Sequence, residues 1–143
     1  MIKHITVTLA ERVGENDPWQ TKWAKKALDL GYDLNLVHFR VPREEGQPSH
    51  VAVVYLDSGA GFVGMAHYNP KDRYNPKYQY SRHRGYMKAC RRAFQAYVRR
   101  DSRSRFEVLT DPDDQTIARR HFVCEARSLC QAKLQQIQER EHE

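Results

Sequence analysis

The side chains that could carry acid–base or nucleophilic chemistry are seven histidines and three cysteines in a chain of 143 residues. None of them stands in a nucleophile elbow, a His-Glu-x-x-His zinc motif or a P-loop. His67, with Asp72 and His83 nearby in sequence, is the one cluster suited to proton transfer, as in metal-free phosphoryl transfer or RNA cleavage. Contact between His67 and a phosphate group is an equal alternative. We therefore keep a metal-free nuclease or transferase as a third hypothesis and assign no catalytic residue.

The cysteines do not predict a metal site or a disulfide framework. Their number is odd and their spacings are unpaired. Cys124 and Cys130 share a predicted helix but fall on different faces, which argues against a common zinc site. Cys90 falls on the apolar side of its helix, as a small core residue does. We expect no metal and no other cofactor.

Positive charge is concentrated in one part of the chain. Residues 71–105 contain twelve Lys and Arg against two Asp, a net charge of +10, so the remaining residues sum to −4 within the total of +6. A charge distribution polarised in this way is typical of an anion-binding surface. The alternative is a solvated face that only aids solubility. Such faces usually intersperse acidic residues, and this segment has almost none.

Residues 82–101 are predicted to form a helix with two distinct sides. The apolar side comprises Tyr86, Cys90, Ala93, Phe94 and Tyr97. The opposite side, which we call the cationic ridge, comprises Arg84, Lys88, Arg91, Arg92 and Arg99. Like charges four residues apart destabilise an isolated helix by roughly 0.2–0.5 kcal/mol each. The presence of these repulsive pairs along one side of the helix indicates that the ridge faces a counter-anion.

A tyrosine-rich basic loop precedes this helix. Two Asn-Pro steps in residues 69–80 oppose both helix and regular strand, so we predict an ordered but irregular loop. Arginine binds phosphate bidentately, and tyrosine can stack on a base or bond a 2′-hydroxyl. The predicted nucleic-acid or anion-binding residues are Arg82, Arg84, Lys88, Arg91, Arg92, Arg99, Lys71, Arg73, Lys77, His50, Tyr74 and Tyr78.

Alternating and helical patterns predict an α+β fold in one domain, residues 1–143. The expected helices are 18–30, 82–101 and 112–140, the first capped by Asp17 and Gly31. The expected strands are 1–9, 34–41, 51–57 and 62–68, with a short final strand at 105–110. We expect an antiparallel sheet of three to four strands covered on one face by the helices, in the order β-α-β-β-β-α-α.

The order of elements over residues 18–101 resembles that of the double-stranded-RNA-binding domain. The segment Gly46-Gln47-Pro48-Ser49-His50 is similar to the Gly-Pro-x-His signature of that family, with one residue inserted. Arg82, Arg84 and Lys88 stand near the lysines with which its second helix meets phosphates. The resemblance implies that His50 contacts a groove of RNA. The chain departs from the family in the dozen residues before 82–101 and in lacking the glutamate of the first helix.

A looser resemblance covers about 30 residues. Gly64, Ala66, Pro70, Asp72 and Tyr74, followed by a basic helix, look like small accessory proteins encoded by bacteriophages. Some members of that group counter host defence. This resemblance implies an alternative function, an inhibitor that binds a host protein complex or sequesters a small nucleotide.

The sequence thus predicts a non-enzymatic protein that binds nucleic acid, with structured RNA favoured over DNA, or else the acidic surface of a host protein. No apolar stretch is long enough to cross a membrane, so we expect no membrane partner. The N-terminus lacks the apolar block of a signal peptide. We therefore expect a cytoplasmic location, which is the bacterial host's cytoplasm if a phage encodes the chain.

Overall fold

The structure is a computed structural model that describes residues 18–30, 34–43, 46–56, 59–68, 80–108 and 115–141. Its elements are a 3₁₀ turn η1 (Pro18–Gln20), helices α2 (Lys22–Asp29), α3 (Arg82–Arg99) and α4 (Gln115–Glu141), and strands β1 (Asn35–Val41), β2 (Ser49–Tyr55), β3 (Ala60–Ala66) and β4 (Arg105–Glu107). The predicted α+β class with an antiparallel sheet is confirmed.

The four strands lie in the order β1-β2-β3-β4, and each pair is antiparallel. Strand β4 pairs only with the first half of β3, from Ala60 to Phe62. The tight connection from β2 to β3 contains Gly59, whose φ of 102° favours glycine, and its N–H donates to the carbonyl oxygen of Leu56. Because β4 pairs only with Ala60–Phe62, the second half of β3 has no neighbouring strand on the β4 side among the described residues.

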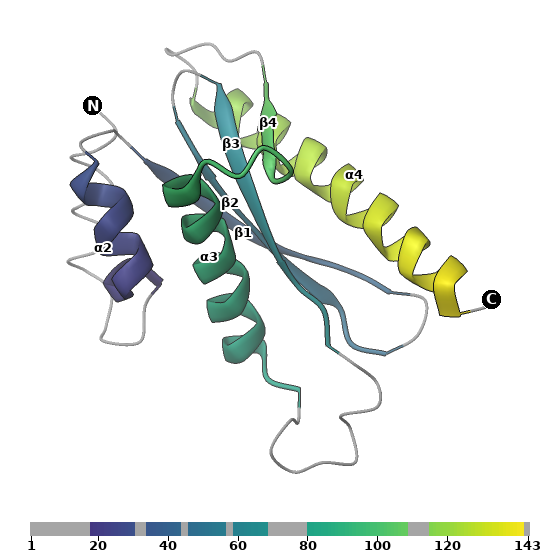
Figure 1. Cartoon of the computed structure of the whole chain (residues 1–143). Helices are drawn as coiled ribbons and strands as arrows, with labels where there is room; N and C mark the ends of the chain where they lie inside the picture. Colours follow the sequence, from purple (N-terminus) through teal and green to yellow (C-terminus); the bar gives the residue numbers. More distant parts are fainter. Residues whose placement is uncertain are drawn as a thin grey trace.

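Two apolar cores lie on opposite faces of the sheet. Residues of β2 and β3 that point to one face, such as Ala52, Val54 and Phe62, pack with α2 and α3. The intervening residues, such as Val53 and Val63, pack with α4. Figure 1 shows α2 and α3 on one side of the strands and α4 on the other. The molecule is thus three layers deep.

The position of α4 corrects the prediction that all helices cover one face. Phe122, Ala126 and Cys130 of α4 are buried against the face opposite α3. All seven residues of β2 are buried, because the strand is covered on both faces. A central strand buried in this way reads as a continuous apolar run.

The first helix also begins later than predicted. Pro18–Gln20 forms a 3₁₀ turn, and Thr21 is the N-cap of α2, since its side-chain oxygen accepts a 3.2 Å hydrogen bond from the N–H of Ala24. The predicted caps Asp17 and Gly31, the strand at 1–9 and nearly all of the loop at 69–80 lie outside the described residues.

Candidate nucleic-acid interface

Helix α3 has well-formed caps at both ends. At its start, the Ser81 hydroxyl oxygen accepts a 3.3 Å hydrogen bond from the N–H of Arg84. At its end, Arg100 adopts a left-handed conformation with φ of 52°, and its N–H donates to the carbonyl oxygens of Ala96 and Tyr97. The predicted boundaries of 82–101 therefore agree with the structure to within two residues.

Two glycines allow α3 to lie close to the sheet. A Cβ atom on Gly64 of β3 would come 2.2 Å from the carbonyl oxygen of Ala89 and 2.3 Å from the backbone nitrogen of Ala93. A Cβ atom on Gly85 of α3 would come 2.3 Å from Cδ2 of the His50 ring. Helix and sheet are therefore in direct backbone contact, and the inner side of α3 is wholly buried there.

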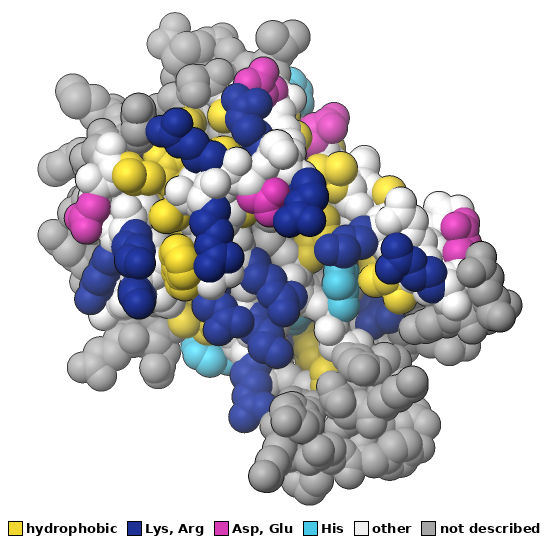
Figure 2. Space-filling view, viewed as in Figure 1, with side chains coloured by type: hydrophobic (Ala, Val, Ile, Leu, Met, Phe, Trp, Pro, Cys, Tyr) yellow, Lys and Arg dark blue, Asp and Glu magenta, His cyan; other side chains and the backbone are white. Residues whose placement is uncertain are grey.

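The outer side of α3 presents the cationic ridge to solvent. All the predicted binding residues of this helix are exposed: Arg82, Arg84, Lys88, Arg91, Arg92 and Arg99. The helix contains no acidic residue. The two ion pairs between described residues lie after α3, joining Arg103 to Asp101 and Arg105 to Glu107. Figure 2 shows dark blue Lys and Arg side chains gathered along α3, with few carboxylates around them.

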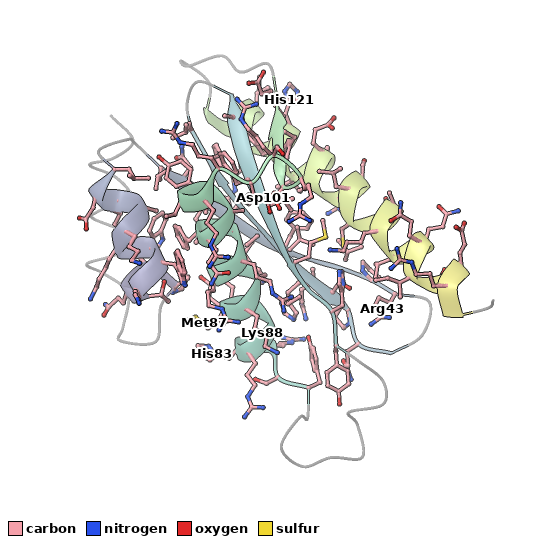
Figure 3. All side chains as sticks on the ribbon, viewed as in Figure 1. Arg43, His83, Met87, Lys88, Asp101 and His121 are labelled. Atoms are coloured by element: carbon pink, nitrogen blue, oxygen red, sulfur yellow. The ribbon has the colours of Figure 1, made fainter. Side chains whose placement is uncertain are left out.

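Two members of the ridge also contact neighbouring elements. Arg92 donates a 2.6 Å hydrogen bond from Nη1 to the carbonyl oxygen of Met65 in β3. Burial lowers the pKa of the Arg92 guanidinium, and the neighbouring charge of Arg91 lowers it further. The Arg99 guanidinium lies 5.0 Å from the centre of the Trp23 ring in α2. Lys88 and Arg91 are exposed on the same helix; Figure 3 shows Lys88 projecting from the first half of α3.

His50 is not a groove contact, which corrects the prediction drawn from the Gly-Pro-x-His resemblance. Its side chain is 2% exposed, in β2, beneath Gly85. The Nδ1 atom lies 3.0 Å from Nε2 of His38, and the Nε2 atom lies 2.9 Å from the Tyr80 hydroxyl. Tyr86 of α3 packs edge-on against His38 at 4.5 Å between ring centres. These contacts anchor the start of α3 to the sheet.

Two members of the cluster considered for catalysis, His67 and His83, are among the described residues. His67 Nδ1 lies 2.7 Å from the Ser49 hydroxyl, and its Nε2 atom is buried with no hydrogen-bond partner among the described residues. Burial lowers the pKa of His67 to about 4, with smaller contributions from Lys133, Arg43 and Arg92. His83 is exposed on α3. Asp72 lies outside the described residues.

The flanking basic loop was expected to complete the interface. Its predicted contacts all lie outside the described residues: Lys71, Arg73, Lys77, Tyr74 and Tyr78. Tyr80, the first described residue after the loop, bonds His50 and packs edge-on against Tyr68. It therefore joins the loop to the His50 anchor and not to the outer side of α3.

Sequence reasoning missed a groove beside the ridge. We call it the edge groove: it has a volume of about 540 Å³ and runs between α3 and α4 along the second half of β3. Arg103 and Lys133 join Arg92 and Arg99 in its lining, with Asp101 as its one carboxylate. No local spacing could have signalled it, because these cations come from α3, α4 and the 101–104 turn.

Within the described ranges, no group of three His, Cys, Asp or Glu side chains is placed to hold a metal ion. None of the helices there has the length and apolar composition needed to cross a bilayer. Comparison of the chain with protein-family models, with curated proteins and with solved structures finds no match.

Proposed function

We propose that this protein binds nucleic acid without chemical turnover, through the cationic ridge of α3, and that its ligand is structured RNA. The observation that carries the proposal is one solvent-facing helix side with several exposed Lys and Arg and no acidic residue. A phosphate backbone places negative charges at regular short intervals, so a rigid row of cations can neutralise several at once.

The rigidity of α3 supports this assignment. The helix is capped at both ends and lies in backbone contact with β3 at Gly64. Its cations are therefore held on a fixed scaffold and need less ordering when they bind a rigid duplex. Binding by shape and phosphates favours a duplex over a particular base sequence. Membership of the double-stranded-RNA-binding family stays a prediction.

A second candidate is the phage-type inhibitor, which would bind an acidic host protein or a small nucleotide in place of RNA. The edge groove favours this candidate, because it offers a cationic concavity that combines Arg92 and Arg99 of the ridge with Arg103 and Lys133. Recovery of partners from bacterial lysate, with and without nuclease treatment, separates the two. A partner that is a protein and survives nuclease would favour the inhibitor.

Binding of labelled RNA and DNA duplexes over a range of salt concentrations tests the proposal. We expect affinity to fall steeply with salt, because each neutralised phosphate releases a counterion. We expect the RNA duplex to bind more tightly than a DNA duplex of equal length. A log–log salt slope near zero for every nucleic acid tested would exclude the proposed function.

A further inference from the structure

Half of the outer edge of strand β3 has no strand beside it in the part of the chain that the structure describes. Residues Ala60–Phe62 pair with β4, and the N–H of Val63 donates a 2.9 Å hydrogen bond to the carbonyl oxygen of Ser104. Beyond Val63, no described strand adjoins β3 on this side. The edge groove begins at this point, with Val63, Gly64 and Met65 along its floor. The groove therefore occupies the place that a longer β4 would fill.

The direction of the backbone groups follows from the pairing. The carbonyl oxygen of Ala60 accepts a hydrogen bond from the N–H of Leu56, on the β2 side, whereas the N–H of Val63 donates to Ser104, on the β4 side. Because backbone groups alternate along a strand, Met65 presents its N–H and carbonyl to the open edge. The carbonyl oxygen of Met65 is met there by Nη1 of Arg92. A free edge of this kind can pair with a strand from another chain.

The walls of the groove define the chemistry of such a strand. Arg92, Arg99, Arg103 and Lys133 oppose one carboxylate, Asp101, so the lining carries a net charge of +3. Asp101 already pairs with Arg103 at 3.4 Å. On the α4 side the groove also presents Leu129, an apolar side chain that is 41% exposed. Figure 3 shows Asp101 just beyond the end of α3, at one end of this surface.

We propose that the open edge of β3 binds an extended acidic segment of a partner protein, which adds as a strand between α3 and α4. Its alternate side chains point to the two faces of the sheet, so acidic residues meet Arg92 and Arg99 while apolar residues meet Leu129. An N–H of the incoming strand replaces Arg92 on the Met65 carbonyl and frees that guanidinium for a carboxylate. Strand binding at this site does not require that the cationic ridge bind nucleic acid.

The test uses a capped, labelled heptapeptide in which glutamate and valine alternate, titrated against the full chain and its variants. Met65→Pro removes the N–H that faces the open edge, where proline is tolerated in a sheet. Met65→Ala is the matched control, because it removes the side chain but keeps the N–H. We expect Met65→Pro to weaken peptide binding at least about tenfold relative to Met65→Ala. Lys133→Glu should weaken it by a similar factor, since it reverses a charge in the groove.

A second probe keeps the test decisive if Met65→Pro does not fold. The same heptapeptide is N-methylated either at the amides that face β3 or at the amides that face away. We expect only the first form to lose binding. Equal binding of the two forms, or no binding of the unmodified peptide, would overturn the proposal. Displacement of the peptide by an RNA duplex, together with weaker RNA binding by Lys133→Glu, would also overturn it, because the groove would then belong to the nucleic-acid interface.

An RNA titration of the same variants separates this proposal from the proposed function. Lys133 and Met65 are not members of the cationic ridge, so their variants should bind RNA as the unmodified chain does. If the unmodified chain binds the peptide but not RNA, that result would contradict the proposed function alone.

Discussion

The backbones of Gly64 and Ala89 meet so closely that a single methyl group does not fit between them. A Cβ atom on Gly64 would lie 2.2 Å from the carbonyl oxygen of Ala89, and the next nearest atom is the backbone nitrogen of Ala93. Neither obstacle can rotate away, because both belong to the α3 backbone. The glycine thus sets the distance between α3 and the sheet, and with it the position of the ridge.

We expect Gly64→Ala to lower the free energy of unfolding by about 3 kcal/mol, since α3 must shift or β3 must deform. Denaturant unfolding followed by circular dichroism measures this change. Met65→Ala, on the other face of the same strand, controls for general sensitivity of β3. A loss below about 0.5 kcal/mol in Gly64→Ala would show that the two backbones are not in contact.

Gly85→Ala offers a test in which two effects oppose each other. In an exposed helix interior, alanine is more stable than glycine by about 1 kcal/mol. At Gly85 the added methyl would lie 2.3 Å from Cδ2 of His50, which is buried and bonded to His38 and Tyr80. We expect the clash to exceed the gain, for a net loss of about 1 kcal/mol. A more stable variant would contradict the packing of α3 on His50.

Much of α3 could be predicted from the sequence, because an apolar stripe and a cationic ridge are both local patterns. Cys90, Ala93, Phe94 and Tyr97 are buried as expected, and the ridge is exposed. The side on which α4 packs could not be predicted from its own periodicity. The unbroken apolar run at 51–55 held the relevant signal, because a strand covered on one face alternates.

The predicted role of His50 as a groove contact was wrong for a related reason. The Gly-Pro-x-His resemblance placed it in a loop, but β2 begins at Ser49 and directs His50 to the same face as Ala52 and Val54. The strand register and the contact with Gly85 are tertiary facts that local sequence does not contain. The edge groove was missed in the same way, since its cations meet only after folding.

Acidification should destabilise the fold before most carboxylates titrate. Burial lowers the pKa of both His38 and His67 to about 4, from an ordinary value of 6.5. Between these values the unfolded chain binds more protons than the folded chain, so the free energy of unfolding falls as pH drops from 6.5 towards 4. The contribution is fully present above 6.5.

Denaturant unfolding at about pH 7.5 and about pH 5.5 measures this loss. Burial also lowers the pKa of His50, so His38→Gln removes one of three such histidines and should make the difference smaller. Gln131→Ala, at an exposed position on α4 with no titrating group, is the control and should leave the difference unchanged. Equal stability of the unmodified chain at the two pH values would contradict neutral, buried histidines.

Labelled RNA should remain intact during binding. His67 is hydrogen-bonded to Ser49. Its lowered pKa leaves it mostly neutral near pH 7, so it rarely carries the proton that a general acid must donate. Denaturing gel electrophoresis after prolonged incubation measures cleavage, and we expect none. Cleavage by the unmodified chain that disappears in His67→Ala would make the protein a nuclease.

The salt dependence of RNA binding by two charge-matched variants is the most direct test that α3 binds the phosphates. Lys88→Ala with Arg91→Ala removes two ridge cations, and Arg119→Ala with Arg120→Ala removes two exposed cations of α4, the helix across the sheet. We expect a log–log salt slope about two units shallower for the ridge pair and an unchanged slope for the α4 pair. Equal slopes for the two variants would contradict the assignment of phosphate binding to α3.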